Sequence, residues 1–72
     1  MELLRLEKFG EWYTAQAAVD GTPCVPFHFH ASERERFPTE ESLMAFIERQ
    51  ARMLIEQYGD ARCPRRTGLE EN

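Results

Sequence analysis

Hydrophobic and polar positions alternate in two regions near the N-terminus, which is the pattern of β-strands with one buried face. The first run, LRLE, ends before Gly10, and we expect a short strand there. The second region, from Trp12 to His30, is interrupted at Asp20-Gly21, a pair typical of hairpin turns. The pattern predicts a small antiparallel three-stranded sheet.

The apolar residues of both hairpin strands fall on odd-numbered positions, and this restricts the register. They are Tyr13, Ala15, Ala17 and Val19 in the first strand, and Val25, Phe27 and Phe29 in the second. A two-residue loop would pair odd with even positions and split the apolar sets between opposite faces. We therefore expect a three-residue loop, Val19-Asp20-Gly21, which pairs Ala17 with Pro23, Ala15 with Val25, and Tyr13 with Phe27.

This register leaves the second face of the hairpin open. Trp12 would lie directly across from His28 on that face. The full set of side chains predicted there is Trp12, Thr14, Gln16, Ala18, Cys24, Pro26, His28 and His30. We expect functional residues of the sheet to be among them.

The segment 40–58 has the apolar spacing of an amphipathic helix. Thr39 is the expected N-cap, and Gly59 is well placed to end the helix. The predicted fold is therefore α+β, with residues 1–59 forming one β-β-β-α domain. Residues 60–72 lack periodicity and contain a proline and a glycine, so we expect a flexible C-terminal tail.

The helix is more apolar than a three-stranded sheet requires, because its hydrophobic arc spans roughly 200°. One margin carries Met44, Ala51 and Ile55, and the other carries Phe46 and Met53. Loops and the first strand could cover the surplus, but a chain of 72 residues builds only a small core, which favours a homodimer. The predicted contact residues are Trp12, His28 and His30 on the sheet, and Met44, Ala51 and Ile55 on the helix.

The net charge and the number of cysteines indicate which partners and which cellular compartment to expect. A net charge of -4 argues against broad attraction to nucleic acid or to an anionic membrane. No apolar run reaches membrane-spanning length, and charged residues interrupt the N-terminal segment MELLRLEKFG, where a signal sequence would need an apolar core. Two cysteines are too few for a disulfide-built secreted scaffold, so we expect a cytoplasmic protein.

His28 and His30 are the most plausible metal ligands, since a His-x-His pair on a strand projects both imidazoles to one face. Cys24 would lie about 13 Å from His28 along an extended strand, too far to share an ion. One chain thus offers two good donors, whereas structural zinc needs four. We predict no metal and no cofactor, and keep as an alternative a site formed by these histidines across a dimer.

No phosphate-binding loop, nucleophile motif or Cys-x-x-Cys pair occurs, and we predict a protein without enzymatic activity. The order of three strands and a helix is similar to that of many small bacterial modules, including antitoxin-type regulatory domains, although no motif matches residue by residue. We expect a protein-interaction or regulatory module. An alternative is a single-stranded nucleic-acid-binding module that stacks bases on the open face and contacts phosphates through Arg62, Arg65 and Arg66.

Overall fold

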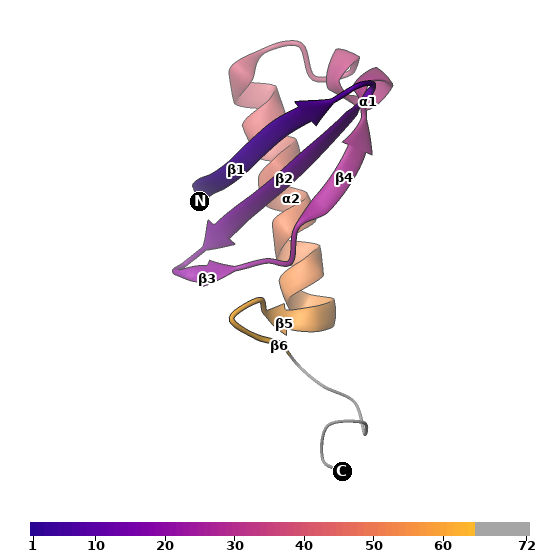
Figure 1. The fold of residues 1–72 in the computed structure, drawn as a ribbon. Helices are drawn as coiled ribbons and strands as arrows, with labels where there is room; N and C mark the ends of the chain where they lie inside the picture. The colour runs from indigo at the N-terminus through magenta and orange to yellow at the C-terminus, as the bar shows by residue number, and fades with distance from the viewer. Residues whose placement is uncertain (65–72) are drawn as a thin grey trace.

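The computed structural model describes residues 1–64 and confirms the α+β class (Figure 1). The central strand is β2 (Trp12–Val19), which pairs with β1 (Glu2–Phe9) on one side. On its other side it pairs with two short strands in succession, β3 (Thr22–Pro23) and β4 (Phe27–His30). All pairs are antiparallel, so the sheet is three chain segments wide, as expected.

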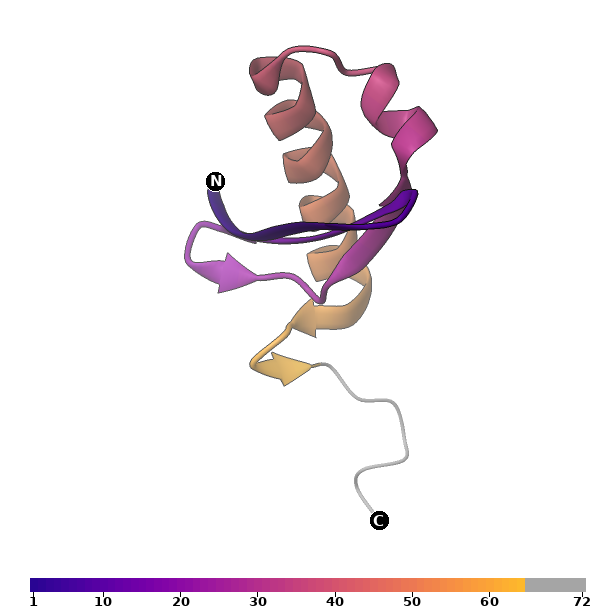
Figure 2. The ribbon, with the colours of Figure 1, turned by 45° about the horizontal axis from the view of Figure 1, so that its top comes forward.

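Two helices and a small hairpin follow the sheet. They are α1 (Ala31–Glu35), α2 (Glu40–Tyr58), β5 (Gly59–Asp60) and β6 (Cys63–Pro64). In both views α2 lies behind the sheet, which leaves the opposite face toward the viewer in Figure 1 (Figures 1 and 2). No helix within residues 1–64 has the length and hydropathy needed to span a membrane.

The hairpin turn at Asp20-Gly21 differs from the sequence-based prediction. Asp20 and Gly21 have φ angles of 53° and 81°, the pair of positive values typical of a two-residue type I′ turn. Val19 pairs with Thr22 across it, so the predicted three-residue loop is wrong. The sequence pattern disfavours a two-residue turn, because such a turn pairs odd with even positions. The structure nevertheless shows this pairing.

A second irregularity, between β3 and β4, restores the pairing of odd with odd positions. Ala18 pairs with Pro23 and Ala15 pairs with Phe27, so the three residues 24–26 lie opposite only two residues of β2. The extra residue makes this segment a bulge. The segment contains Pro26, which has no N–H to donate to the ladder of hydrogen bonds between the strands. Tyr13 consequently faces Phe29 rather than the predicted Phe27, and Trp12 faces His30 rather than His28.

The bulge also decides the position of Cys24. Its backbone N–H donates to the carbonyl of Ala17 at 2.9 Å, so it shares the face of Ala17, which the helix covers. Cys24 is fully buried there. The prediction that Cys24 lies on the open face is therefore wrong, because the two-residue turn reverses the parity of the residues that follow it directly.

The second helix begins and ends where the sequence predicted. The hydroxyl of Thr39 accepts a hydrogen bond from the backbone N–H of Ser42 at 3.0 Å, and the Ser42 hydroxyl reaches back to the backbone of Thr39. Gly59 ends the helix with a φ of 81°. Both ends are thus capped by local interactions that the sequence reveals.

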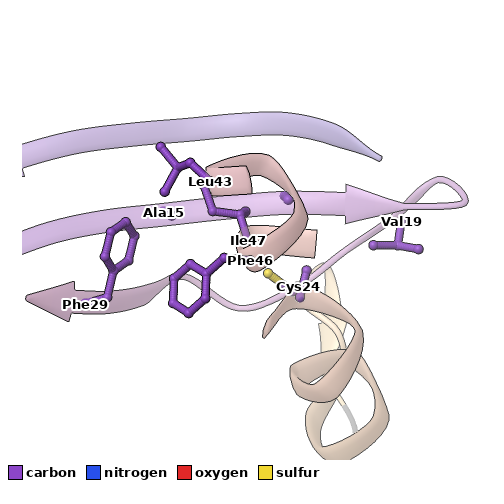
Figure 3. Packing of buried hydrophobic residues seen from close by; sticks show 9 residues of the cluster. Ala15, Val19, Cys24, Phe29, Leu43, Phe46 and Ile47 are labelled. Atoms are coloured by element: carbon purple, nitrogen blue, oxygen red, sulfur yellow. The ribbon is translucent and has the colours of Figure 1, made fainter. Parts of the chain in front are cut away.

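The core lies between α2 and the covered face of the sheet (Figure 3). Phe46 is central, because its ring meets Phe29 edge-on at 5.3 Å and stacks on Phe37 at 4.7 Å. The buried cluster comprises Ala15, Ala17, Val19, Cys24, Phe29, Leu43, Phe46, Ile47 and Ala51. Alanines at the middle of β2 leave space for the larger side chains of the helix.

Residues 60–64, placed in the tail from the sequence, form a β5–β6 hairpin with Gly59. The backbone N–H of Ala61 donates to the carbonyl of Pro23 at 2.9 Å, and Arg62 donates to the carbonyl of Gly21 at 3.2 Å. The hairpin is thereby attached to the end of the sheet at β3. The remainder of the predicted tail, residues 65–72, lies outside the described residues.

Candidate interaction surface

The open face of the sheet carries a cluster of aromatic side chains where β1 meets β2. Phe9 pairs with Trp12 across the turn at Gly10, and both are exposed, by 62% and 53%. Together with Thr14 and His28 they line a shallow apolar hollow of about 490 Å³. We call these four residues the aromatic patch.

His28 is the polar member of the patch. It faces Thr14 across the β2–β4 pair, and its Nδ1 lies 2.9 Å from the Thr14 hydroxyl. Thr14 itself is buried, so this hydrogen bond orients the exposed imidazole at the rim of the hollow. The patch therefore combines two large apolar rings with one fixed polar group.

His30 lies beside the patch but has a structural role. Its Nδ1 accepts a hydrogen bond from the backbone N–H of Ser32 and so caps α1, while its Nε2 lies 3.2 Å from a carboxylate oxygen of Glu11. Trp12 contacts the His30 ring edge-on, with 5.0 Å between centroids. Because both ring nitrogens have partners, His30 fits a positioning role for Trp12 better than a ligand role.

Within the described residues, the fold does not group His28 and His30 with a further metal ligand. Within residues 1–64, no group of three or more histidine, cysteine or acidic side chains is arranged to hold an ion. Cys24 lies on the opposite face, and His30 is held by Ser32 and Glu11. A site formed by His28 and His30 across a dimer stays a prediction.

Exposed apolar side chains concentrate at the N-terminal end of the chain. Seven large hydrophobic residues of the described part are exposed, and five of them lie within the first twelve positions: Met1, Leu3, Leu4, Phe9 and Trp12. The other two are Met53 and Tyr58 on α2. Strand β1 thus carries exposed apolar side chains near both of its ends, with Arg5 and Glu7 between them on the open face, and this strand was not among the contacts predicted from the sequence.

The helix margin predicted as a contact surface packs in part against the core of the same chain. Ala51 is fully buried, and Met44 and Ile55 are half-buried against the core. The expectation of an exposed margin is therefore wrong for Ala51. On the other margin, Phe37 of the connector stacks on Phe46, which explains how a small domain covers so wide an apolar arc.

Met53 remains exposed beside a groove between α2 and the Asp20 turn. The groove has a volume of about 550 Å³ and is open to solvent along the helix. Its walls include Arg49 and Arg52, and Arg52 pairs with Glu48 at 2.7 Å. That ion pair lowers the pKa of the Glu48 carboxyl below its ordinary value.

The structure describes only one of the three arginines proposed for phosphate contact, Arg62. Arg62 donates to Asp60 at 2.9 Å and to the carbonyl of Gly21, so its guanidinium serves the β5–β6 hairpin. The hydrogen bonds from Arg62 hold the pKa of the Asp60 carboxyl below its ordinary value. Arg65 and Arg66 lie outside the described residues.

Sequence reasoning identified Trp12 and His28 but missed Phe9 and the rest of β1. A signal for Phe9 exists, since Gly10 and Glu11 form a tight turn that pairs residue 9 with residue 12.

No family model, curated protein or solved structure that was compared with this chain matches the chain.

Proposed function

We propose that this protein is a small interaction module that acts as a homodimer, and that two copies join through the edge strand β1. The observation that carries the proposal is the concentration of exposed apolar side chains on this strand. Exposed apolar side chains gathered on one strand of a small domain favour an interaction site there, and an edge strand offers unpaired backbone groups to another strand. A second copy of β1 satisfies both at once.

The covered helix margin supports this choice of surface. Met44, Ala51 and Ile55 already contact the core, so this margin of α2 needs no second chain to pack against. Leu3 and Leu4 on β1 are exposed, by contrast, and α2 packs mainly against β2. A partner at the β1 edge would bury apolar surface that the chain itself leaves open.

We propose no enzymatic activity, because the histidines that could perform chemistry serve the fold. His28 is oriented by Thr14, and His30 caps α1. The buried thiol of Cys24 lies in the core, away from both. Cysteine usage supports a cytoplasmic location, with Cys24 present as a free thiol.

The aromatic patch is the second surface of the proposed module. Pairing at the β1 edge leaves the open faces uncovered, so a dimer would present two patches to another protein. Tryptophan and phenylalanine are favoured anchors at such contacts. Trp12 and His28 stay proposed contacts for that further protein.

Single-stranded nucleic acid is the alternative occupant of the patch. Phe9 and Trp12 could stack on bases. Glu7, however, is on the same face, and Glu11 lies in the adjoining turn, so phosphates would approach carboxylates. Charge therefore favours a protein partner over nucleic acid.

Sedimentation equilibrium of matched variants tests the proposal. Leu4→Lys adds a charge to the edge strand, and we expect it to raise the dimer dissociation constant at least tenfold. Met53→Lys is the control, because Met53 is similarly exposed, by 48% against 45%, but lies on α2. Trp12→Ala should leave the dimer intact. A dimer that Trp12→Ala disrupts and Leu4→Lys leaves unchanged would show association through the open face instead.

A further inference from the structure

The edge strand β1 has a short regular stretch available for pairing. Its inner side pairs with β2, and the register shifts at Leu4. The strand ends at Phe9, just before the turn. A second strand added to the outer side would therefore find its regular pairing positions from Arg5 to Lys8.

Symmetry restricts how two copies of this stretch can pair. In a closed dimer of two identical antiparallel strands, the two-fold axis is perpendicular to the sheet, and one residue faces its own copy. Centring on Arg5, Glu7 or Lys8 would set two like charges directly opposite each other, which destabilises a sheet. Centring on Leu6 sets two leucines opposite each other. Leu6 is thus the one centre within this stretch without a like-charge contact.

The Leu6 register also brings opposite charges together. Arg5 of each copy faces Glu7 of the other, so the pairing forms two ion pairs across the new strand boundary. Arg5 and Glu7 already share the open face, as shown by their side-chain contact of 2.9 Å within one chain. Charges on edge strands normally discourage pairing. Here their alternation is complementary to itself in one register.

The same register extends the hydrophobic core. Leu6 pairs with Ala15 and packs at the border of the core cluster, where it is half-buried. A perpendicular two-fold axis keeps both helices on the same face of the joined sheet. The two Leu6 side chains would then meet between the two cores and cover each other.

We propose that a second copy of this chain pairs with β1 in the antiparallel register centred on Leu6, with Arg5 of each copy opposite Glu7 of the other. This inference rests on the proposed function and adds the residues that select the partner. The joined sheet is continuous through both chains and displays both aromatic patches on one face.

Charge exchange tests this register. Arg5→Glu creates a strand with two glutamates on its open face, and Glu7→Arg creates one with two arginines. Each variant alone sets like charges opposite in both pairs, so we expect a dimer dissociation constant at least tenfold above that of the wild type. An equimolar mixture restores both ion pairs, and native mass spectrometry should show a heterodimer in excess over both homodimers.

The double variant R5E/E7R is the matched control, since it exchanges the charges within one chain and restores each pair. It should form homodimers with nearly wild-type affinity. Circular dichroism of all variants checks the fold, which should be kept because both side chains are about half exposed. Single variants that dimerise as well as the wild type would overturn the register while leaving self-association intact. A monomeric wild type would overturn the proposed function as well.

Discussion

Cys24 shows at the scale of one residue how position decides chemistry. As a member of the open face it would be a thiol on the same face as two histidines, whereas the structure buries it fully against α2. A buried cysteine behaves as a small hydrophobic side chain, and its reactivity is suppressed because reagents cannot reach it.

We predict that the Cys24 thiol reacts with a maleimide reagent only when the protein unfolds. The measurement uses a Cys63→Ala background, so that Cys24 alone reports. Cys24→Ser should lower the free energy of unfolding by about 1–3 kcal/mol, because it buries a hydroxyl among apolar groups, and Cys24→Ala should cost less. Labelling of the folded protein at the rate of a free thiol would contradict the observed parity of this segment.

The same residue shows why the sequence predicts faces less well than elements. The alternation of apolar residues located the strands, but their faces depend on the turn at Asp20 and on the bulge before Phe27. Two compensating one-residue changes leave the overall pattern of odd positions intact. Residues between them, such as Cys24, are assigned to the wrong side.

At the scale of elements, local chemistry predicted α2 most successfully. Its capping residues and its apolar period are encoded within the helix and its flanking residues, so Thr39 and Gly59 could be read directly. The stacking of Phe37 on Phe46 depends on the path of the connector. That tertiary contact explains why the helix needs less cover from a partner than its sequence suggested.

The β5–β6 hairpin was not predicted, since its attachment consists of polar contacts to the distant β3 turn. We predict that Arg62→Gln raises the pKa of Asp60 toward its ordinary value, as measured by NMR of the carboxyl carbon. Because the pKa of Asp60 is lower in the folded protein than in the unfolded chain, its interaction with Arg62 stabilises the fold at pH values above the ordinary pKa of the carboxyl. This stabilisation is lost as the pH falls through the lowered pKa of the folded protein. Arg49→Gln is the control, and an Asp60 pKa unaffected by Arg62→Gln would contradict the contact.

At the scale of the whole molecule, the fold uses its long helix α2 and the connector before it to cover one face of a narrow sheet. The consequence is that, among the described residues, most of the exposed large hydrophobic side chains lie on β1 and in the adjoining aromatic patch, with Met53 and Tyr58 on α2 as the others. The sequence suggested a surplus of apolar surface and a dimer, but it located the surplus on the helix. Only the packed structure shows that more exposed apolar side chains lie on and beside β1 than on the helix.

The most direct test of this account is hydrogen exchange of the backbone amides at low and high protein concentration. Outward-facing amides of β1 are unpaired in the monomer and would become hydrogen-bonded in the edge-paired dimer. We predict that the outward-facing amides of the Arg5–Lys8 stretch exchange more slowly as concentration rises, while those of α2 keep the same rates. Exchange of β1 that does not depend on concentration, or new protection confined to other elements, would contradict pairing through this strand.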